Sequence, residues 1–165
     1  MSEINKKDGP VAVTGASGYI GSRIVEDLVG QGYEVHACVR DASNGKKVDH
    51  LVKLGQDANN CDVQLFEGDL FEKGSYDDAF SGCISVIHAG ATVGFNRETP
   101  QEVYDGCFTE NEHVVESVKK SGSVKRFVFT SSFAAVAHPR PEGYVFSEKD
   151  WCGDNVEAYK GAWTE

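Results

Sequence analysis

Three glycines near the start of the chain have the spacing of a phosphate-binding turn. Gly15, Gly18 and Gly21 form a G-x-x-G-x-x-G motif that follows a β-branched run and opens an amphipathic stretch. Glycine permits a tight turn and a close approach of the backbone to a pyrophosphate, which the N-terminus of the following helix then stabilises. We therefore predict nucleotide binding, the alternative being a purely structural turn. The loop positions expected to contact the nucleotide are Gly15, Ser17, Gly18, Tyr19, Ile20 and Gly21.

A basic residue stands at the end of the second predicted strand, where the ribose of a dinucleotide would lie. Dinucleotide-binding folds place an acidic residue there for the ribose 2′-hydroxyl, whereas an arginine accommodates a 2′-phosphate. This chain has Arg40, whose guanidinium can hold a phosphate through paired hydrogen bonds. We expect Arg40 to favour a 2′-phosphorylated cofactor. The alternative is a solvated surface charge, and the neighbouring Asp41 would weaken the attraction.

A parallel sheet is needed to bring these residues together, and the sequence has the corresponding alternation. Short β-branched runs alternate with helical stretches, which is typical of βαβ units. We expect strands at 10–14, 34–39, 62–67, 83–89 and 126–130, and helices at 19–29, 46–54, 75–80 and 101–121. Right-handed crossovers then predict an α/β fold, a doubly wound Rossmann-type sheet in the order 3-2-1-4-5, forming one domain over residues 1–165. Ligands bind such sheets at the carboxyl ends of the strands.

Composition and charge favour an ordinary globular domain and disfavour several classes of partner. The 165 residues are 40% hydrophobic and 25% charged, and 16 basic against 26 acidic residues give a net charge of −10. Such a charge disfavours nonspecific binding to nucleic acid or to an anionic membrane. The longest mostly apolar run, 127–137, is too short and polar to span a bilayer, and no signal peptide is evident. The five cysteines include no C-x-x-C pair, and no histidines have metal-ligand spacing, so we expect reduced thiols, no metal site and a cytoplasmic protein.

Several segments, in the right order, resemble one known family. VTGASGYIGS (13–22) is similar to the cofactor loop of extended short-chain dehydrogenases/reductases, above all the subgroup of dihydroflavonol 4-reductase and cinnamoyl-CoA reductase. Matching stretches follow at 39–41, 46–51, 68–70, 82–88 and 126–132. The resemblance implies an oxidoreductase that binds NADP(H) and transfers a hydride between NADPH and a small-molecule ketone or aldehyde.

The resemblance also implies roles for individual residues. Lys47 would join Arg40 at the 2′-phosphate, and Asp69 would accept from the adenine amino group with Leu70 packed beside the ring. Without the family, Gly68-Asp69 would be interpreted as a plain turn. The nicotinamide half would lie against Ala89, Gly90 and Ala91, where the subgroup usually carries Val-Ala-Thr.

The catalytic residues of the family are matched only in part. Ser132, the second serine after the fifth predicted strand, occupies the position of the serine that orients the carbonyl, the alternative being a hydroxyl that caps the turn. The family's Tyr and Lys form Y-x-x-x-K, because residues four apart share one face of a helix. Tyr144 and Tyr159 have no lysine four residues on, and Lys160 directly follows Tyr159, about 100° away around a helix. We therefore expect a truncated reductase, its N-terminal cofactor-binding part without the C-terminal substrate region.

Two other functions stay open at this point. One is a nucleotide-binding or redox-sensing module without catalysis, which the missing Y-x-x-x-K would suit. The other is a fragment of a sugar-nucleotide epimerase or dehydratase, because such enzymes share the glycine loop and the serine. A Y-x-x-x-K encoded within the next few dozen codons would favour the reductase over the non-catalytic module.

Overall fold

Five parallel strands form the centre of the molecule in the computed structural model, which describes residues 5–57, 62–91, 99–136 and 140–151. The strands are β1 (Val11–Thr14), β2 (Val35–Val39), β3 (Val63–Glu67), β4 (Ser85–His88) and β5 (Arg126–Phe129). Their order in the sheet is β3-β2-β1-β4-β5, which confirms the order predicted from the sequence. β1 lies at the centre, so the loop that leaves it emerges between the ends of β2 and β4.

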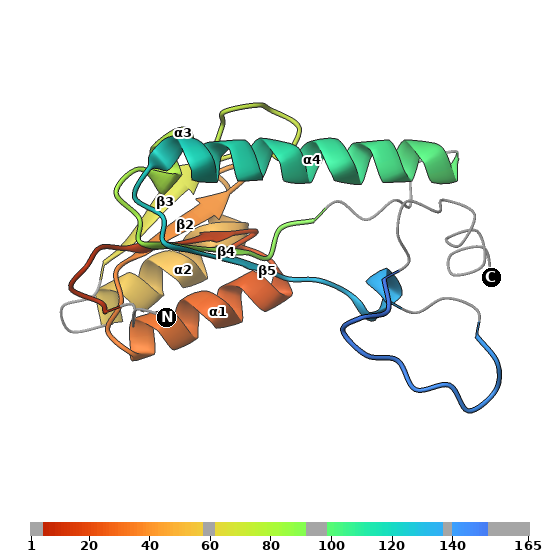
Figure 1. Cartoon of the computed structure of the whole chain (residues 1–165). Helices are drawn as coiled ribbons and strands as arrows, with labels where there is room; N and C mark the ends of the chain where they lie inside the picture. The colour runs from red at the N-terminus through yellow and green to blue at the C-terminus, as the bar shows by residue number, and fades with distance from the viewer. Residues whose placement is uncertain (1–4, 58–61, 92–98, 137–139, 152–165) are drawn as a thin grey trace.

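Helices cover both faces of the sheet (Figure 1). The helical segments are α1 (Tyr19–Gly30), α2 (Gly45–Asp57), α3 (Asp77–Phe80), α4 (Pro100–Ser121) and the 3-10 turn η1 (Phe133–Ala135). α1 and α2 lie on one face, and α3 and α4 lie on the other, so the α/β doubly wound Rossmann-type fold is confirmed. β4 starts two residues later than expected, because the N–H of Cys83 donates to the carbonyl of Phe80 and closes the turn after α3.

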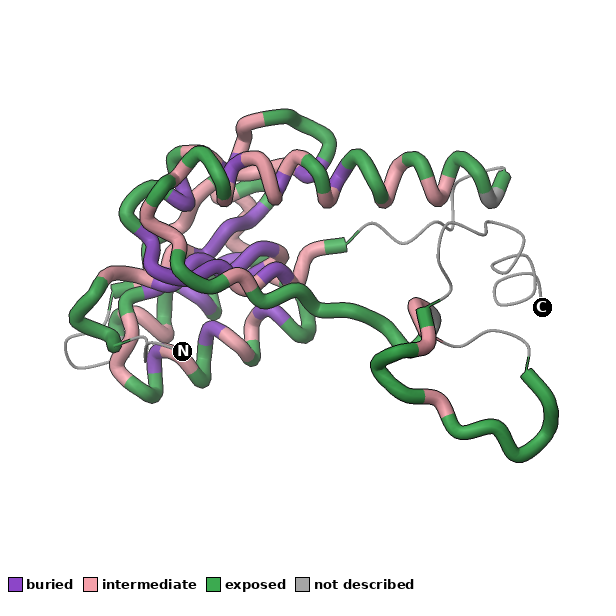
Figure 2. Tube along the Cα trace, in the orientation of Figure 1, coloured by how far each residue is buried: buried purple, intermediate pink, exposed green. Residues whose placement is uncertain are grey.

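The core consists of two apolar layers, one on each face of the sheet. Val13, Val25 and Leu51 are fully buried between the sheet and the pair α1 and α2. Phe80 and Val114 are fully buried on the opposite face. Burial of each such side chain contributes roughly 1.5–3 kcal/mol. Figure 2 shows the buried positions concentrated in the inner strands, whereas the segment after β5 is mostly exposed.

Local signals fix both ends of α4, the longest of the described helices. The Thr99 hydroxyl accepts from the N–H of Glu102, and the Glu102 carboxylate accepts from the N–H of Thr99, which forms a capping box. Gly122 ends the helix in the left-handed region, at φ +64°. α4 therefore begins and ends at defined residues. Among the described residues, no helix is long and apolar enough to cross a membrane.

Two of the five cysteines are buried thiols in the core. Cys38 and Cys83 are 1% and 0% exposed, and burial raises the pKa of both, to about 12 for Cys83. A neutral buried thiol is unreactive, so these two cysteines act as small apolar side chains. Cys61 and Cys152 lie outside the described residues.

Candidate cofactor-binding site

The turn after β1 lies directly against the backbone that leaves β4. Gly15 has φ +65°, and a Cβ on it would lie 2.8 Å from both the nitrogen and the Cα of Gly90. Glycine is thus required at this position for two reasons, the left-handed backbone and the close approach of Gly90. The structure brings together two predicted site segments, the glycine loop and residues 89–90, at the carboxyl edge of the sheet.

The other two glycines of the motif let α1 begin close to this turn. A Cβ on Gly21 would lie 2.1 Å from the carbonyl oxygen of Gly15, so only glycine fits there. The N–H of Gly18 donates to the same carbonyl over 2.9 Å. Within the described residues no side chain caps α1, and its first turn holds no acidic residue. Its N-terminal amides and dipole could therefore hold an anion such as a phosphate.

The remaining loop positions face outward or partly outward. Tyr19 and Ile20 are 89% and 54% exposed, and Ser17 is half-buried. Large exposed side chains beside an uncapped helix N-terminus leave room for a ligand to bind against them. Their contacts with a nucleotide remain predictions.

A buried chain of hydrogen bonds joins the ends of β1 and β4 to α4. The Thr14 hydroxyl lies 2.6 Å from Nδ1 of His88 and accepts from the N–H of Gly90 over 3.1 Å. Nε2 of His88 lies 3.0 Å from Oδ1 of Asn111, whose amide in turn donates to the carbonyl of Cys107. Since the Asn111 oxygen accepts, Nε2 carries the proton, and Nδ1 accepts from the Thr14 hydroxyl. The chain holds the N–H of Gly90 in place, next to the glycine loop.

His88 is therefore a neutral imidazole. Burial lowers its pKa, and the hydrogen bond to Asn111 opposes this effect only partly. From the sequence, the place of His88 at a strand end predicts only a packing role for it, and no role is predicted for Thr14 or Asn111. The available signal was the position of Thr14 and His88 at the ends of buried strands, where they are register partners.

Arg40 and Asp69 meet across the ends of two neighbouring strands, β2 and β3. Nε of Arg40 lies 3.8 Å from Oδ2 of Asp69, and the arginine side chain is 73% exposed. The other oxygen, Oδ1, accepts from the N–H of Phe71 over 2.9 Å and so shapes the turn. An exposed pair of this kind contributes at most about 1 kcal/mol, so a phosphate can compete for the guanidinium.

The acidic neighbour of Arg40 is engaged elsewhere. The Asp41 carboxylate accepts from the N–H and the hydroxyl of Ser43, at 2.9 and 2.6 Å, and these bonds lower its pKa. Lys47, exposed in the first turn of α2, also lowers that pKa through its charge, so it lies near this turn. The structure thus gives Asp41 a local role in the turn that leads into α2.

The other predicted site residues have varied surroundings. Leu70 is 7% exposed and belongs to the core on the α4 side. Ala89 is half-buried and Ala91 is exposed. Ser132 is exposed at the start of η1, where its carbonyl accepts from the N–H of Ala135. Among the described residues, no cluster of His, Cys, Asp or Glu could hold a metal ion.

Most of the chain matches the model of one protein family. The NAD dependent epimerase/dehydratase family matches residues 11–160, from β1 to beyond Ser132. The chain belongs to this family. The matched range includes the glycine loop, Arg40 and Asp69.

Two relatives of the chain are plant reductases by name. The chain is 43% identical over 151 residues to cinnamoyl-CoA reductase CAD2 of Medicago truncatula, covering 86% of this chain and 46% of the relative. It is 42% identical over 142 residues to dihydroflavonol 4-reductase of Arabidopsis thaliana, covering 86% and 37%. The chain therefore spans less than half the length of each. The extended short-chain reductase resemblance is confirmed.

Solved structures agree with this placement in the family. Vestitone reductase from alfalfa (Medicago sativa) superposes with a TM-score of 0.67 at 25% identity, over 87% of this chain and 42% of that structure. Gre2 from Candida albicans, solved in complex with NADPH, superposes with a TM-score of 0.72 at 25% identity, over 86% and 43%.

The tyrosines considered for the catalytic pair do not provide one. Tyr144 lies in the exposed segment after η1, and its hydroxyl donates to Asp150, which raises the pKa of the phenol. Tyr159 and Lys160 lie outside the described residues. A catalytic role for Ser132 stays a prediction.

Proposed function

We propose that this chain is the NADP(H)-binding part of a carbonyl reductase of the dihydroflavonol reductase and cinnamoyl-CoA reductase type. The observation that carries the proposal is the close contact of Gly15 with Gly90 at the carboxyl edge, beside the uncapped N-terminus of α1. Backbone segments packed this closely let the chain turn from β1 directly into α1, whose N-terminal amides suit a pyrophosphate. The relatives named above are reductases, and one of the similar structures contains NADPH. These names favour a reductase over an epimerase or dehydratase.

The proposed roles follow the strand ends. The loop from Gly15 to Gly21 and the first turn of α1 would hold the pyrophosphate, and Arg40 with Lys47 would hold the 2′-phosphate. Asp69 has one carboxylate oxygen in its own turn and the other toward Arg40, so Oδ2 is the acceptor available to an adenine amino group. Leu70, Ala89, Gly90 and Ala91 would complete the surface beneath the cofactor.

The chemistry would take place at the nicotinamide end. NADPH, when bound, supplies a hydride to the carbonyl carbon of a ketone or aldehyde. The chain's own part is to fix the cofactor and, through the Ser132 hydroxyl, to donate a hydrogen bond that orients the carbonyl oxygen. The hydrogen bonds of Thr14 and His88 would keep the N–H of Gly90 fixed beneath that end.

Calorimetric titration with NADPH and NADH tests the cofactor assignment. We expect tighter binding of NADPH, and we expect Arg40→Ala to cost about 1.5–3 kcal/mol for NADPH with little effect on NADH, because a charge-assisted hydrogen bond is lost. Arg126→Ala is the matched control, since Arg126 is exposed at the amino end of β5, away from the cofactor edge. Equal affinities for the two cofactors in the unmodified chain would contradict a 2′-phosphate site at Arg40.

A further inference from the structure

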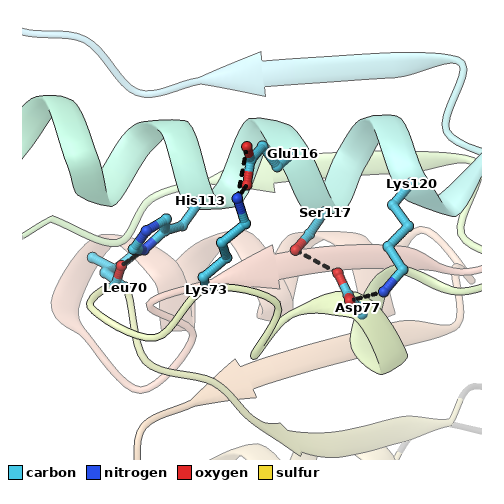
Figure 3. Close-up of polar contacts among 7 residues, drawn as sticks. All are labelled: Leu70, Lys73, Asp77, His113, Glu116, Ser117 and Lys120. Carbon is cyan, nitrogen blue, oxygen red and sulfur yellow. Dashed lines mark hydrogen bonds and ion pairs between the residues drawn. The ribbon is translucent and has the colours of Figure 1, made fainter.

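One stripe of α4 holds the loop that follows β3. His113, Glu116, Ser117 and Lys120 recur at helical spacing and point toward residues 70–77 (Figure 3). Glu116 pairs with Lys73 at 2.9 Å, and the Ser117 hydroxyl donates to Asp77 over 2.7 Å. These contacts, and that of Lys120 with Asp77, are made to Lys73 in the loop and to Asp77, the first residue of α3.

Of the α4 side chains in this stripe, His113 makes the contact nearest in sequence to Asp69. Its Nδ1 lies 3.0 Å from the carbonyl oxygen of Leu70. A carbonyl can only accept, so Nδ1 carries the proton and donates. Within the turn, the Ser75 hydroxyl bonds to the backbone of Asp69, and from the end of β2 Arg40 pairs with the Asp69 carboxylate. His113 is thus the α4 side chain that holds the residue directly following Asp69.

We infer that His113 is a positioning residue for the adenine end of the cofactor. By holding the Leu70 carbonyl, it fixes the turn whose Asp69 carboxylate faces the adenine. A turn that is already ordered loses less conformational entropy when the ligand binds, so the ligand binds more tightly. The inference rests on the proposed function, because it assumes that an adenine nucleotide occupies this edge.

Substitutions of His113 separate positioning from general stability. The probe is adenosine 2′,5′-bisphosphate, which contains the adenine end without nicotinamide. His113→Leu removes the donor, and we expect its dissociation constant for the probe to rise about five-fold, as for one lost hydrogen bond. His113→Asn places an amide nitrogen where Nδ1 stood, and we expect it to restore most of the affinity. His113→Gln displaces the amide by one bond, so it should behave like His113→Leu and provides a second loss variant.

Ser117→Ala is the matched control on the same stripe. It removes the contact with Asp77, so we expect a lower Tm but an affinity for the bisphosphate within two-fold of the unmodified chain. Calorimetry and thermal unfolding are measured for all four variants. An equal loss of affinity in Ser117→Ala, or no loss in either His113→Leu or His113→Gln, would overturn the inference and leave the proposed function standing. Failure of the unmodified chain to bind the bisphosphate would overturn the proposed function as well.

Discussion

At the scale of single residues, the buried histidine at the end of β4 links the stability of the fold to pH. His88 is 2% exposed, and its ring contacts those of Phe127 and Phe129, with centroids 6.2 and 5.1 Å away. Its two nitrogens bond to Thr14 and Asn111 in a way that requires the neutral form. A proton on Nδ1 would remove the acceptor that the Thr14 hydroxyl uses.

The lowered pKa of His88 makes stability depend on pH. The unfolded chain has a histidine pKa near 6.5, and the folded value is lower, so the unfolded state binds the proton more readily. The contribution of neutral His88 to the free energy of unfolding is therefore fully present above about pH 6.5. The stability of the fold decreases as the pH falls below that value. We expect His88→Asn, whose amide oxygen can accept from the Thr14 hydroxyl in place of Nδ1, to reduce the fall in Tm between pH 7.5 and 5. His50→Gln, at an exposed position of α2, is the control and should leave that fall unchanged. An unchanged slope in His88→Asn would contradict the assignment.

The role of a residue could be predicted from the sequence where the local backbone geometry allows only one residue type. The glycines of the loop could be recognised because their spacing, the preceding strand and the following helix lie within one short segment. The Thr14, His88 and Asn111 network could not be recognised, because it joins residues 74 and 23 positions apart. Only the register of β1 against β4 places these side chains together.

At the scale of elements, the junction of the glycine loop with α1 gives a test within one helix. A Cβ at Gly21 would collide with the Gly15 carbonyl, whereas a Cβ at Gly30 meets no atom within 4 Å. We expect Gly21→Ala to destabilise the fold by about 1–3 kcal/mol through overpacking. Gly30→Ala should be neutral or stabilise it by up to about 1 kcal/mol, because alanine restricts the unfolded chain. Urea unfolding measures both, and similar effects for the two variants would contradict this packing of α1.

The elements themselves were largely predictable, but their contacts with each other were not. Strands and helices have periodicities that can be seen within ten or so residues, and right-handed crossovers then restrict the strand order. The stripe of α4 that binds the loop after β3 looks in sequence like an ordinary charged face. Its partners lie 40 and 43 positions away, and only the packed helix brings them within reach.

At the scale of the whole molecule, we expect the chain to bind NADPH without catalysing carbonyl reduction. No tyrosine in the 165 residues has a lysine four positions on, so the pair that donates the proton in this family has no counterpart here. General acid catalysis contributes about 10²–10⁴-fold, and positioning of the hydride donor against the carbonyl contributes further. We therefore expect the chain to bind NADPH and to oxidise it no faster than background with aldehydes, ketones or flavanone-type substrates. The measurement is the decrease of NADPH absorbance over time, with calorimetry on the same sample to establish that the cofactor is bound. Ser132→Ala is the control. Saturable turnover that Ser132→Ala abolishes would contradict the prediction, because it would require a different proton donor, such as Tyr159 or a residue of a partner chain.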